Sequence, residues 1–140
     1  MTTKQYLLDT NILVEFVHGN VQIIDRIKRV GFKRCCISPI SLHELYYGAY
    51  NALEKKKEYF SQEMERIARI RERFDLLPLQ EEADDYAKIK VRLRNTGKIV
   101  DEFDMVIAGQ AVDAGLTVVT DNVKHFENMP GAKIENWRER

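Results

Sequence analysis

Short apolar runs alternate with helix-like segments along this chain, and this alternation restricts its fold more than any other feature. The runs that read as strands lie at residues 5–8, 34–37, 76–79, 117–120 and, as a short edge strand, 132–135. Amphipathic periodicity and capping residues predict helices at residues 11–17, 21–30, 53–73, 80–96 and 101–114, and one that begins at Pro39. Strands that alternate with helices form βαβ units, whose right-handed crossovers produce a parallel sheet covered on both faces. We therefore expect an α/β fold with a central, mainly parallel sheet of four to five strands.

The size and charge of the chain limit the classes of protein to consider. Its 140 residues suit one domain with a proper core, and its formal net charge of zero means that any nucleic-acid contact must use local basic faces. Cys35 and Cys36 are neighbours in a predicted strand, so they should face opposite sides as buried, reduced thiols. No signal-peptide pattern and no apolar run of about 20 residues is present. We expect a cytoplasmic protein with no membrane partner.

Three acidic residues stand near the end of a predicted strand or the beginning of a predicted helix. Asp9 follows the first strand, Asp121 follows the strand at 117–120, and Asp104 lies in the first turn of the helix at 101–114. Each has a structural explanation, because Asp9 could cap a helix, Asp104 could stabilise a helix N-terminus and Asp121 could form a turn. In an open parallel sheet, however, such places meet at one edge. Acidic side chains gathered there repel one another unless a cation joins them, so the pattern indicates a metal site.

Glu44 is the acidic residue that is hardest to explain structurally. It follows Ile37 and Ile40 and precedes Gly48 at three- and four-residue steps, so it shares a helical stripe with residues that should face the protein. A partly buried carboxylate without a partner is unfavourable. We therefore expect a cation or a hydrogen-bonded partner beside Glu44, with a buried arginine salt bridge as the alternative.

Four segments carry these residues: LLDTNIL, SPISLHELYYG, IVDEFDMVIAGQA and LTVVTDNVKHFENMPGAKIENW. Together they resemble the PIN-domain ribonucleases, and most closely the VapC-type toxins of type II toxin–antitoxin pairs. The similarity covers nearly the whole chain in the order and spacing of the family. It implies a single PIN-like domain over residues 1–140, built as a three-layer αβα sandwich. One departure is Gly109, where the family often has alanine, and it is not expected to affect the chemistry.

The resemblance also assigns functional positions to this chain. The acidic positions of the family match Asp9, Glu44, Asp104 and Asp121. Its polar companions, which would orient the substrate or the attacking water, match Thr10, Asn11, Thr120 and Asn122. The fourth acidic position varies between Asp and Asn in the family. Asp101 is commonly acidic as well, and we interpret it mainly as a helix cap.

The activity that the resemblance implies is cleavage of RNA phosphodiester bonds with the help of Mg²⁺ or Mn²⁺. Carboxylate oxygens suit these ions rather than zinc, and the sequence has no set of Cys and His residues with zinc-binding spacing. In this interpretation Asp9 and Asp104 are the primary metal ligands. Glu44 binds directly or through water and helps to deprotonate the nucleophile, and Asp121 supports the site.

The family also implies protein partners. A VapC-type toxin is held inactive by a cognate antitoxin whose C-terminal segment covers the acidic site, and such toxins pair as homodimers within toxin–antitoxin hetero-oligomers. The apolar stripe of the helix at 53–73, together with Tyr46, Tyr47 and Tyr50, could supply either interface.

Basic residues between positions 87 and 100 offer a place for RNA. This stretch contains Lys90, Arg94 and Lys98 among five basic residues and has no acids. Basic residues near a helix C-terminus also favour the helix dipole, which is the simpler explanation. The functional interpretation is that this end of the helix flanks the acidic site and contacts the phosphate backbone. Both explanations can hold together.

Two other functions share part of this pattern. A haloacid-dehalogenase-type phosphatase also has an Asp after its first strand, but it needs a second Asp two residues later, where Asn11 stands. A non-catalytic PIN-like binding module would have lost one or more acids. The histidines rank low: His43 begins HE without the second His of a zinc-binding HExxH motif and points away from the face of Glu44, and His125 is expected to be structural or near the rim.

Overall fold

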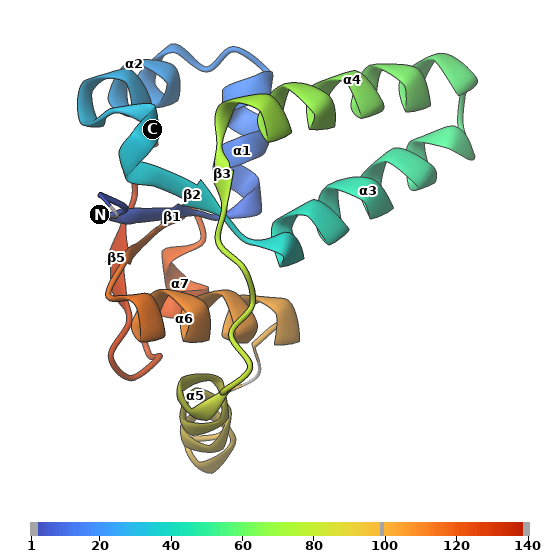
Figure 1. Cartoon of the computed structure of the whole chain (residues 1–140). Coiled ribbons are helices and arrows are strands. Elements are labelled where there is room, and N and C mark those ends of the chain that lie inside the picture. Colours follow the sequence, from blue (N-terminus) through green and yellow to red (C-terminus); the bar gives the residue numbers. More distant parts are fainter. Residues whose placement is uncertain (1–2, 99, 139–140) are drawn as a thin grey trace.

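The computed structural model describes residues 3–98 and 100–138, and its strands form a parallel sheet between two layers of helices (Figure 1). The strands are β1 (Tyr6–Leu8), β2 (Cys35–Ile37), β3 (Asp75–Leu76), β4 (Thr117–Val119) and β5 (Lys133–Glu135). The helices are α1 (Thr10–Val17), α2 (Val21–Val30), α3 (Pro39–Leu53), α4 (Lys57–Arg73), α5 (Asp84–Asn95), α6 (Glu102–Ala114) and α7 (Val123–Phe126), with a 3₁₀ turn, η1 (Phe32–Arg34). The expected α/β fold with a parallel sheet is confirmed. None of the helices in the described part of the chain has the length and hydrophobicity required to span a bilayer.

The order of the strands creates one switch point in the sheet. The order is β3-β2-β1-β4-β5, and every neighbouring pair is parallel. The chain therefore builds outward from β1 to β3 and then returns to the other side of β1 as β4. Leu8 pairs with Val119, so the residues that follow them, Asp9 and Thr120, leave the sheet side by side. The carboxyl ends of the strands beside such a reversal are the usual place for a binding crevice in an open α/β sheet.

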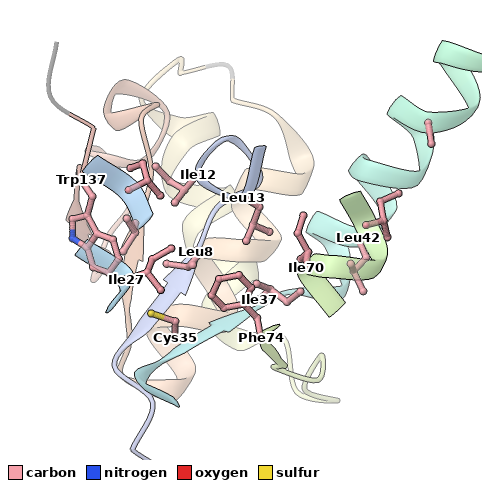
Figure 2. Close-up of a cluster of buried hydrophobic side chains, with 14 residues drawn as sticks. Leu8, Ile12, Leu13, Ile27, Cys35, Ile37, Leu42, Ile70, Phe74 and Trp137 are labelled. Atoms are coloured by element: carbon pink, nitrogen blue, oxygen red, sulfur yellow. The ribbon is translucent and has the colours of Figure 1, made fainter. Parts of the chain in front are cut away.

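Alternate strand residues face two separate cores. Leu8 and Cys35 pack among side chains of α1 to α4, as Figure 2 shows, whereas Leu7 and Cys36 pack among side chains of α5 to α7. The neighbouring cysteines therefore face opposite layers, and both are buried free thiols, as the sequence predicts. Burial raises the pKa of Cys35 to about 12 and that of Cys36 to about 11, which keeps both protonated at neutral pH.

The helix predicted at residues 53–73 was wrong at its beginning. α3 continues to Leu53, and the chain turns at Lys56, whose backbone is extended, before α4 begins. This turn lets the two helices pack against each other as a hairpin that extends away from the sheet (Figure 1). Near its tip the rings of Tyr50 and Phe60 meet edge to face, with centroids 5.0 Å apart.

The connection after β3 also differs from the prediction. The strand expected at residues 76–79 ends at Leu76, and the helix expected at 80–96 begins only at Asp84. Pro78 has no N–H to donate, so the strand cannot continue its ladder beyond Leu77. The intervening segment instead carries the chain from β3 to α5 (Figure 1). The other predicted elements agree with the structure to within one residue, whereas the short segments η1 and α7 were not predicted.

Gly109 lies where α5 comes closest to α6. A Cβ placed on Gly109 would lie 2.9 Å from Tyr86 Cβ and 3.0 Å from both Tyr86 Cα and Tyr86 N. Because two of these atoms belong to the backbone, a methyl group could be accommodated only if the helices moved apart. The glycine at a position where the family often has alanine is therefore explained by the close approach of these two helices.

We expect Gly109→Ala to lower the free energy of unfolding by roughly 1–3 kcal/mol, the usual effect of overpacking a tight contact. Gly48→Ala is the matched control, because Gly48 is also helical and nothing lies within 4 Å of an added Cβ there. The control should stabilise the protein by up to about 1 kcal/mol through helix propensity. Urea unfolding of both variants measures the difference. Equal stabilisation by the two changes would contradict the tight-contact explanation.

Candidate active site

Asp9 lies between the end of β1 and the beginning of α1, and it is only 4% exposed. Its backbone N–H donates to the carbonyl of Val119 at 2.9 Å, which continues the pairing with β4. Its Oδ1 accepts from the backbone N–H of Thr10 at 2.8 Å, as a helix cap does. Its Oδ2 accepts from the Thr120 hydroxyl at 2.9 Å and from the Asn11 amide at 3.2 Å. Asp9 is thus a helix cap and a firmly oriented buried carboxylate at once.

Glu44 is half-buried on α3 and faces the same edge of the sheet. Its Oε1 accepts from the hydroxyl of Thr10 at 2.6 Å, and that hydroxyl also lies 3.0 Å from Ser41 Oγ. Because a hydroxyl has one proton, Thr10 donates to the Glu44 carboxylate and accepts from Ser41. The arginine alternative was wrong, since no ion pair joins Glu44 to another described residue. Gly48 was also wrongly placed: it is exposed, because α3 leaves the sheet beyond Glu44.

Asp104 lies in the first turn of α6 and is 8% exposed. The preceding Asp101 caps this helix by accepting from the N–H of Phe103 at 2.8 Å, as the sequence predicts. Asp104 Oδ2 lies 2.7 Å from Nδ1 of His125 on α7. His125 therefore contacts one of the candidate acids directly.

A buried polar link fixes α6 against the rest of the site. The hydroxyl of Ser38, which caps α3, hydrogen bonds to Gln110 Oε1 on α6. The Gln110 amide also donates to the carbonyl of Leu77 at 3.0 Å. Both side chains are almost fully buried. The link holds α6, and so Asp104, in a fixed position relative to α3, which carries Glu44.

The three carboxylates influence one another's ionisation. Burial is the main cause that raises the pKa of Asp9, Glu44 and Asp104 above their ordinary values. The charge of Asp104 further raises the pKa of Asp9, and the charges of Asp9 and Asp104 both raise the pKa of Glu44. Hydrogen bonds from Thr120, Thr10 and His125 respectively oppose these increases. The structure therefore brings these three acids close enough to repel one another.

The donor chemistry of the three acids fits a hard divalent cation. Among residues 3–98 and 100–138, no lysine or arginine lies within 4 Å of these carboxylates, and His125 is their sole basic contact. Carboxylate oxygens are the ligands that Mg²⁺ and Mn²⁺ prefer. Within the same ranges, no three acidic, His or Cys side chains are grouped closely enough to hold an ion as they stand. The acids are near enough for their charges to interact, but each carboxylate is hydrogen-bonded to a donor of its own.

Asp121 belongs to a neighbouring network. Its backbone N–H donates to Asn11 Oδ1 at 3.0 Å, which ties it to the other acids through the backbone. Its side chain accepts from Asn136 at 3.3 Å and lies 3.3 Å from the guanidinium of Arg138, which also pairs with Glu15 at 2.9 Å. The charge of Asp121 is not among those that raise the pKa of the other three acids.

The four polar companions all lie at this edge. The side chains of Thr10, Asn11 and Thr120 contact the carboxylates directly. Asn122 donates its backbone N–H to Thr120 Oγ1 at 2.9 Å, and its side chain helps to line a hollow of about 370 Å³ beside His125. Three of the four companions therefore fix the orientation of the acids.

The basic residues that the sequence offers for RNA binding line one hollow of about 270 Å³ at the beginning of α6; they are Lys90, Arg94 and Lys98. Lys90 is engaged there, because its ammonium lies 2.7 Å from Glu102 Oε1. Arg94 and Lys98 are exposed and form no ion pair with another described residue. Met105, which follows Asp104, lines the same hollow, so this basic hollow adjoins the acidic site.

Comparison with known proteins gives the family. The profile of the PIN domain matches residues 6–132. The chain belongs to the PIN-domain family. Ribonuclease VapC2 of Haemophilus influenzae is 33% identical over 135 residues, which cover 95% of this chain and 98% of that protein. The tRNA(fMet)-specific endonuclease VapC of Salmonella typhimurium is 31% identical, with the same coverage of both chains.

Solved structures agree with this assignment. A chain of the DNA-bound VapBC complex from Salmonella typhimurium superposes with a TM-score of 0.84 and 31% identity, over 96% of this chain and 99% of that chain. A chain of VapBC2 from Rickettsia felis gives a TM-score of 0.83 and 27% identity, over 95% and 98%. These likenesses place the chain among the VapC ribonucleases of the PIN-domain family.

Contacts between distant segments of this PIN domain were not predicted from its sequence. His125 was expected to be structural or near the rim, and neither the Ser38–Gln110 link nor the bridge from Arg138 to Asp121 was foreseen. No local signal identifies these residues, because each partner lies in a different element. His43 is exposed, and its Nδ1 lies 2.7 Å from the carbonyl of Pro39 on its own helix.

Asp104→Asn should stabilise the metal-free protein more at pH 7.5 than at pH 4. Because the folded-state pKa of Asp104 is raised, the folded protein keeps a proton that the unfolded chain loses above about pH 4. The wild-type free energy of unfolding therefore falls as the pH rises through this window, and Asn removes that loss. Urea unfolding in EDTA at both pH values measures it. Asp113→Asn, an exposed acid on the same helix, is the control and should change little. A destabilised Asp104→Asn at pH 7.5 would favour the purely structural explanation.

Proposed function

We propose that this chain is an Mg²⁺- or Mn²⁺-dependent endoribonuclease that acts as the toxin of a toxin–antitoxin pair. The observation that carries the proposal is the set of three carboxylates at the switch point of the sheet, with Asp9 and Asp104 buried and Glu44 half-buried. The charge of Asp104 raises the pKa of Asp9, the charges of both raise the pKa of Glu44, and the three acids have no lysine or arginine partner among the described residues. RNA as the substrate is supported by the relatives, which are named ribonucleases and a tRNA-specific endonuclease.

Each residue then has a defined part in the chemistry. Asp9 and Asp104 would hold the ion as primary ligands, and Glu44 would bind it directly or through water. When bound, the ion lowers the pKa of water and offsets charge on the phosphate. Thr10 and Thr120 keep the carboxylates turned in fixed directions through the hydrogen bonds described above. In-line attack of water on the phosphodiester leaves a 5′-phosphate and a 3′-hydroxyl.

Asp121 has a supporting part in this proposal. Its backbone contact with Asn11 helps to fix the side chain that bonds Asp9. Its carboxylate is engaged by Arg138, in keeping with a family position that varies between Asp and Asn. An Asn at position 121 would keep this backbone hydrogen bond to Asn11, because the side chain takes no part in it.

The two solved relatives support an antitoxin partner, because both are VapBC complexes bound to DNA. We propose a cognate antitoxin, a homodimer and a toxin–antitoxin hetero-oligomer for this chain, which would fold as a single PIN-like domain over residues 1–140. The surface available for these contacts is the hairpin of α3 and α4. Its exposed large apolar side chains are Tyr47, Tyr50, Leu53 and Tyr59.

The phosphatase alternative loses its basis. The chain belongs to the PIN-domain family, and Asn11 rather than a second acid stands two residues after Asp9. The remaining alternative is a non-catalytic binding module, and an RNA cleavage assay distinguishes it from a nuclease.

Asp9→Asn should reduce RNA cleavage in Mg²⁺ or Mn²⁺ by roughly 100-fold or more, the usual loss when a group that stabilises transition-state charge is removed. The exposed Asp113→Asn on α6 should stay within about two-fold of wild type. Purified proteins and a labelled total transfer RNA provide the assay. If wild type leaves transfer, ribosomal and messenger RNA intact in both metals, the binding module is the better explanation.

A double variant, Arg94→Glu with Lys98→Glu, should weaken RNA binding through the basic hollow. In an Asp9→Asn background, which prevents cleavage, the slope of log K against log salt should decrease in magnitude by about 0.7 for each lost phosphate contact, or about 1.4 for both. Fluorescence anisotropy with a single-stranded RNA measures the slope. Lys57→Glu with Arg69→Glu, which makes the same change in net charge at two exposed positions of α4, is the control. An equal effect of the control would place RNA elsewhere.

A further inference from the structure

Among the described residues, the side chains that contact the three central acids are hydroxyls and an amide, with one exception. Asp9 is bound by Asn11 and Thr120, and Glu44 by Thr10. Asp104 is bound by an imidazole, since its Oδ2 lies 2.7 Å from His125 Nδ1. Nothing in the sequence, the family resemblance or the relatives' names assigns a part to this histidine.

The geometry of the contact distinguishes the two oxygens of Asp104. Oδ2 is held by His125, whereas Oδ1 has no hydrogen bond to any described residue. The terminal torsion of an aspartate is broad and roughly two-fold, so without a partner the two oxygens would exchange places by rotation. Only 11% of the Asp104 side chain is exposed, so water offers little to replace the imidazole. The contact therefore fixes which oxygen faces away from α7.

The protonation pattern of the ring follows from its partner. An ionised carboxylate only accepts hydrogen bonds, so His125 Nδ1 carries the proton and donates it to Asp104. The ring is 47% exposed and lines the hollow of about 370 Å³ that it shares with Asn122 and Lys124. The backbone at His125 is held in place, because the next residue, Phe126, is fully buried in the core formed with α5 to α7.

We propose that His125 is a positioning residue for Asp104: its Nδ1–H holds Oδ2 and leaves Oδ1 as the oxygen available to the divalent cation. This inference rests on the proposed metal-dependent function and deepens it. Carboxylate ligands of metal ions are themselves hydrogen-bonded, and loss of such a partner commonly lowers metal affinity 10- to 100-fold. His125 acts through Asp104 and needs no contact with the RNA.

Substitutions at His125 separate this role from simple packing. His125→Asn keeps an N–H at the position of Nδ1, His125→Gln moves it outward to that of Nε2, and His125→Ala removes it. We expect Mn²⁺ affinity, measured by calorimetry without RNA, to fall roughly 10- to 100-fold in the Ala and Gln variants. The Asn variant should stay within about three-fold of wild type. His43→Ala is the control, because it also removes an imidazole whose Nδ1 lies 2.7 Å from an oxygen.

Two further measurements keep the test independent of activity and folding. Affinity for a single-stranded RNA in EDTA should be unchanged in all the His125 variants, and a large loss there would make His125 a substrate contact and overturn the proposal. In wild-type protein at pH 8, long-range ¹H–¹⁵N spectra should show a proton on His125 Nδ1. A bare Nδ1 would also overturn the proposal, even if the Ala variant failed to fold.

The outcome for the wild type separates this inference from the proposed function. If wild type binds neither Mn²⁺ nor Mg²⁺, the metal-dependent function fails and the role of His125 fails with it. If wild type binds Mn²⁺ and His125→Ala binds it equally well, the positioning role alone is overturned. Equal losses in the Asn and Ala variants would also contradict it, because the N–H at Nδ1 would then not be the cause.

Discussion

The structure depends on keeping three like-charged carboxylates near one another at a buried edge. Burial raises the pKa values of Asp9, Glu44 and Asp104, and repulsion from neighbouring acids raises each of them further. The surrounding chain opposes this with hydrogen bonds rather than with lysine or arginine among the described residues. An arginine partner would neutralise such a site and fill it. Hydroxyl, amide and imidazole donors orient the oxygens and leave negative charge available for a cation.

Parallel pairing explains why this edge can be built from distant segments. Because Leu8 pairs with Val119, the residues that follow β1 and β4 must leave the sheet together. Ser38 follows β2 in the same way and begins the helix that carries Glu44. Only Asp104 comes from a helix that does not start directly at a strand end. That helix is therefore the one that needs additional fixation, which the buried Gln110 and the contact with His125 provide.

Much of this arrangement could be predicted from the sequence, because its determinants are local. Apolar runs marked the strands, and caps such as Asp9 and Asp101 marked helix starts. The positions of the acids relative to strand ends then followed from the rules of parallel sheets. The errors arose where local pattern and tertiary context disagree. The apolar stripe of α4 merged with the end of α3 because nothing local shows that Lys56 is extended, and apolar residues after Leu76 resembled a strand although Pro78 cannot donate to a ladder.

The site contacts that sequence analysis missed share one physical origin. His125, Ser38 and Arg138 act on side chains that lie at least 17 positions away in the sequence. Periodicity and motif spacing report which face of an element a residue occupies, but not which side chain meets it from another element. Asp121 illustrates the difference. Its position after β4 was foreseen, whereas its engagement by Arg138 depends on how the segment after β5 returns to the sheet edge.

Helix α6 is where these constraints meet, and its packing also sets the position of the basic hollow. Gly109 lets α5 approach closely at Tyr86, and the Tyr86 hydroxyl hydrogen bonds to Glu102 in the first turn of α6. The ammonium of Lys90 joins the same two groups. The C-terminal half of α5 is thereby held beside the turn that carries Asp104. The absence of a methyl group at Gly109 thus sets the spacing between α5 and α6. That spacing in turn sets the distance between the basic residues and the acids. It therefore affects how a phosphate backbone bound by the basic residues could reach the acidic site.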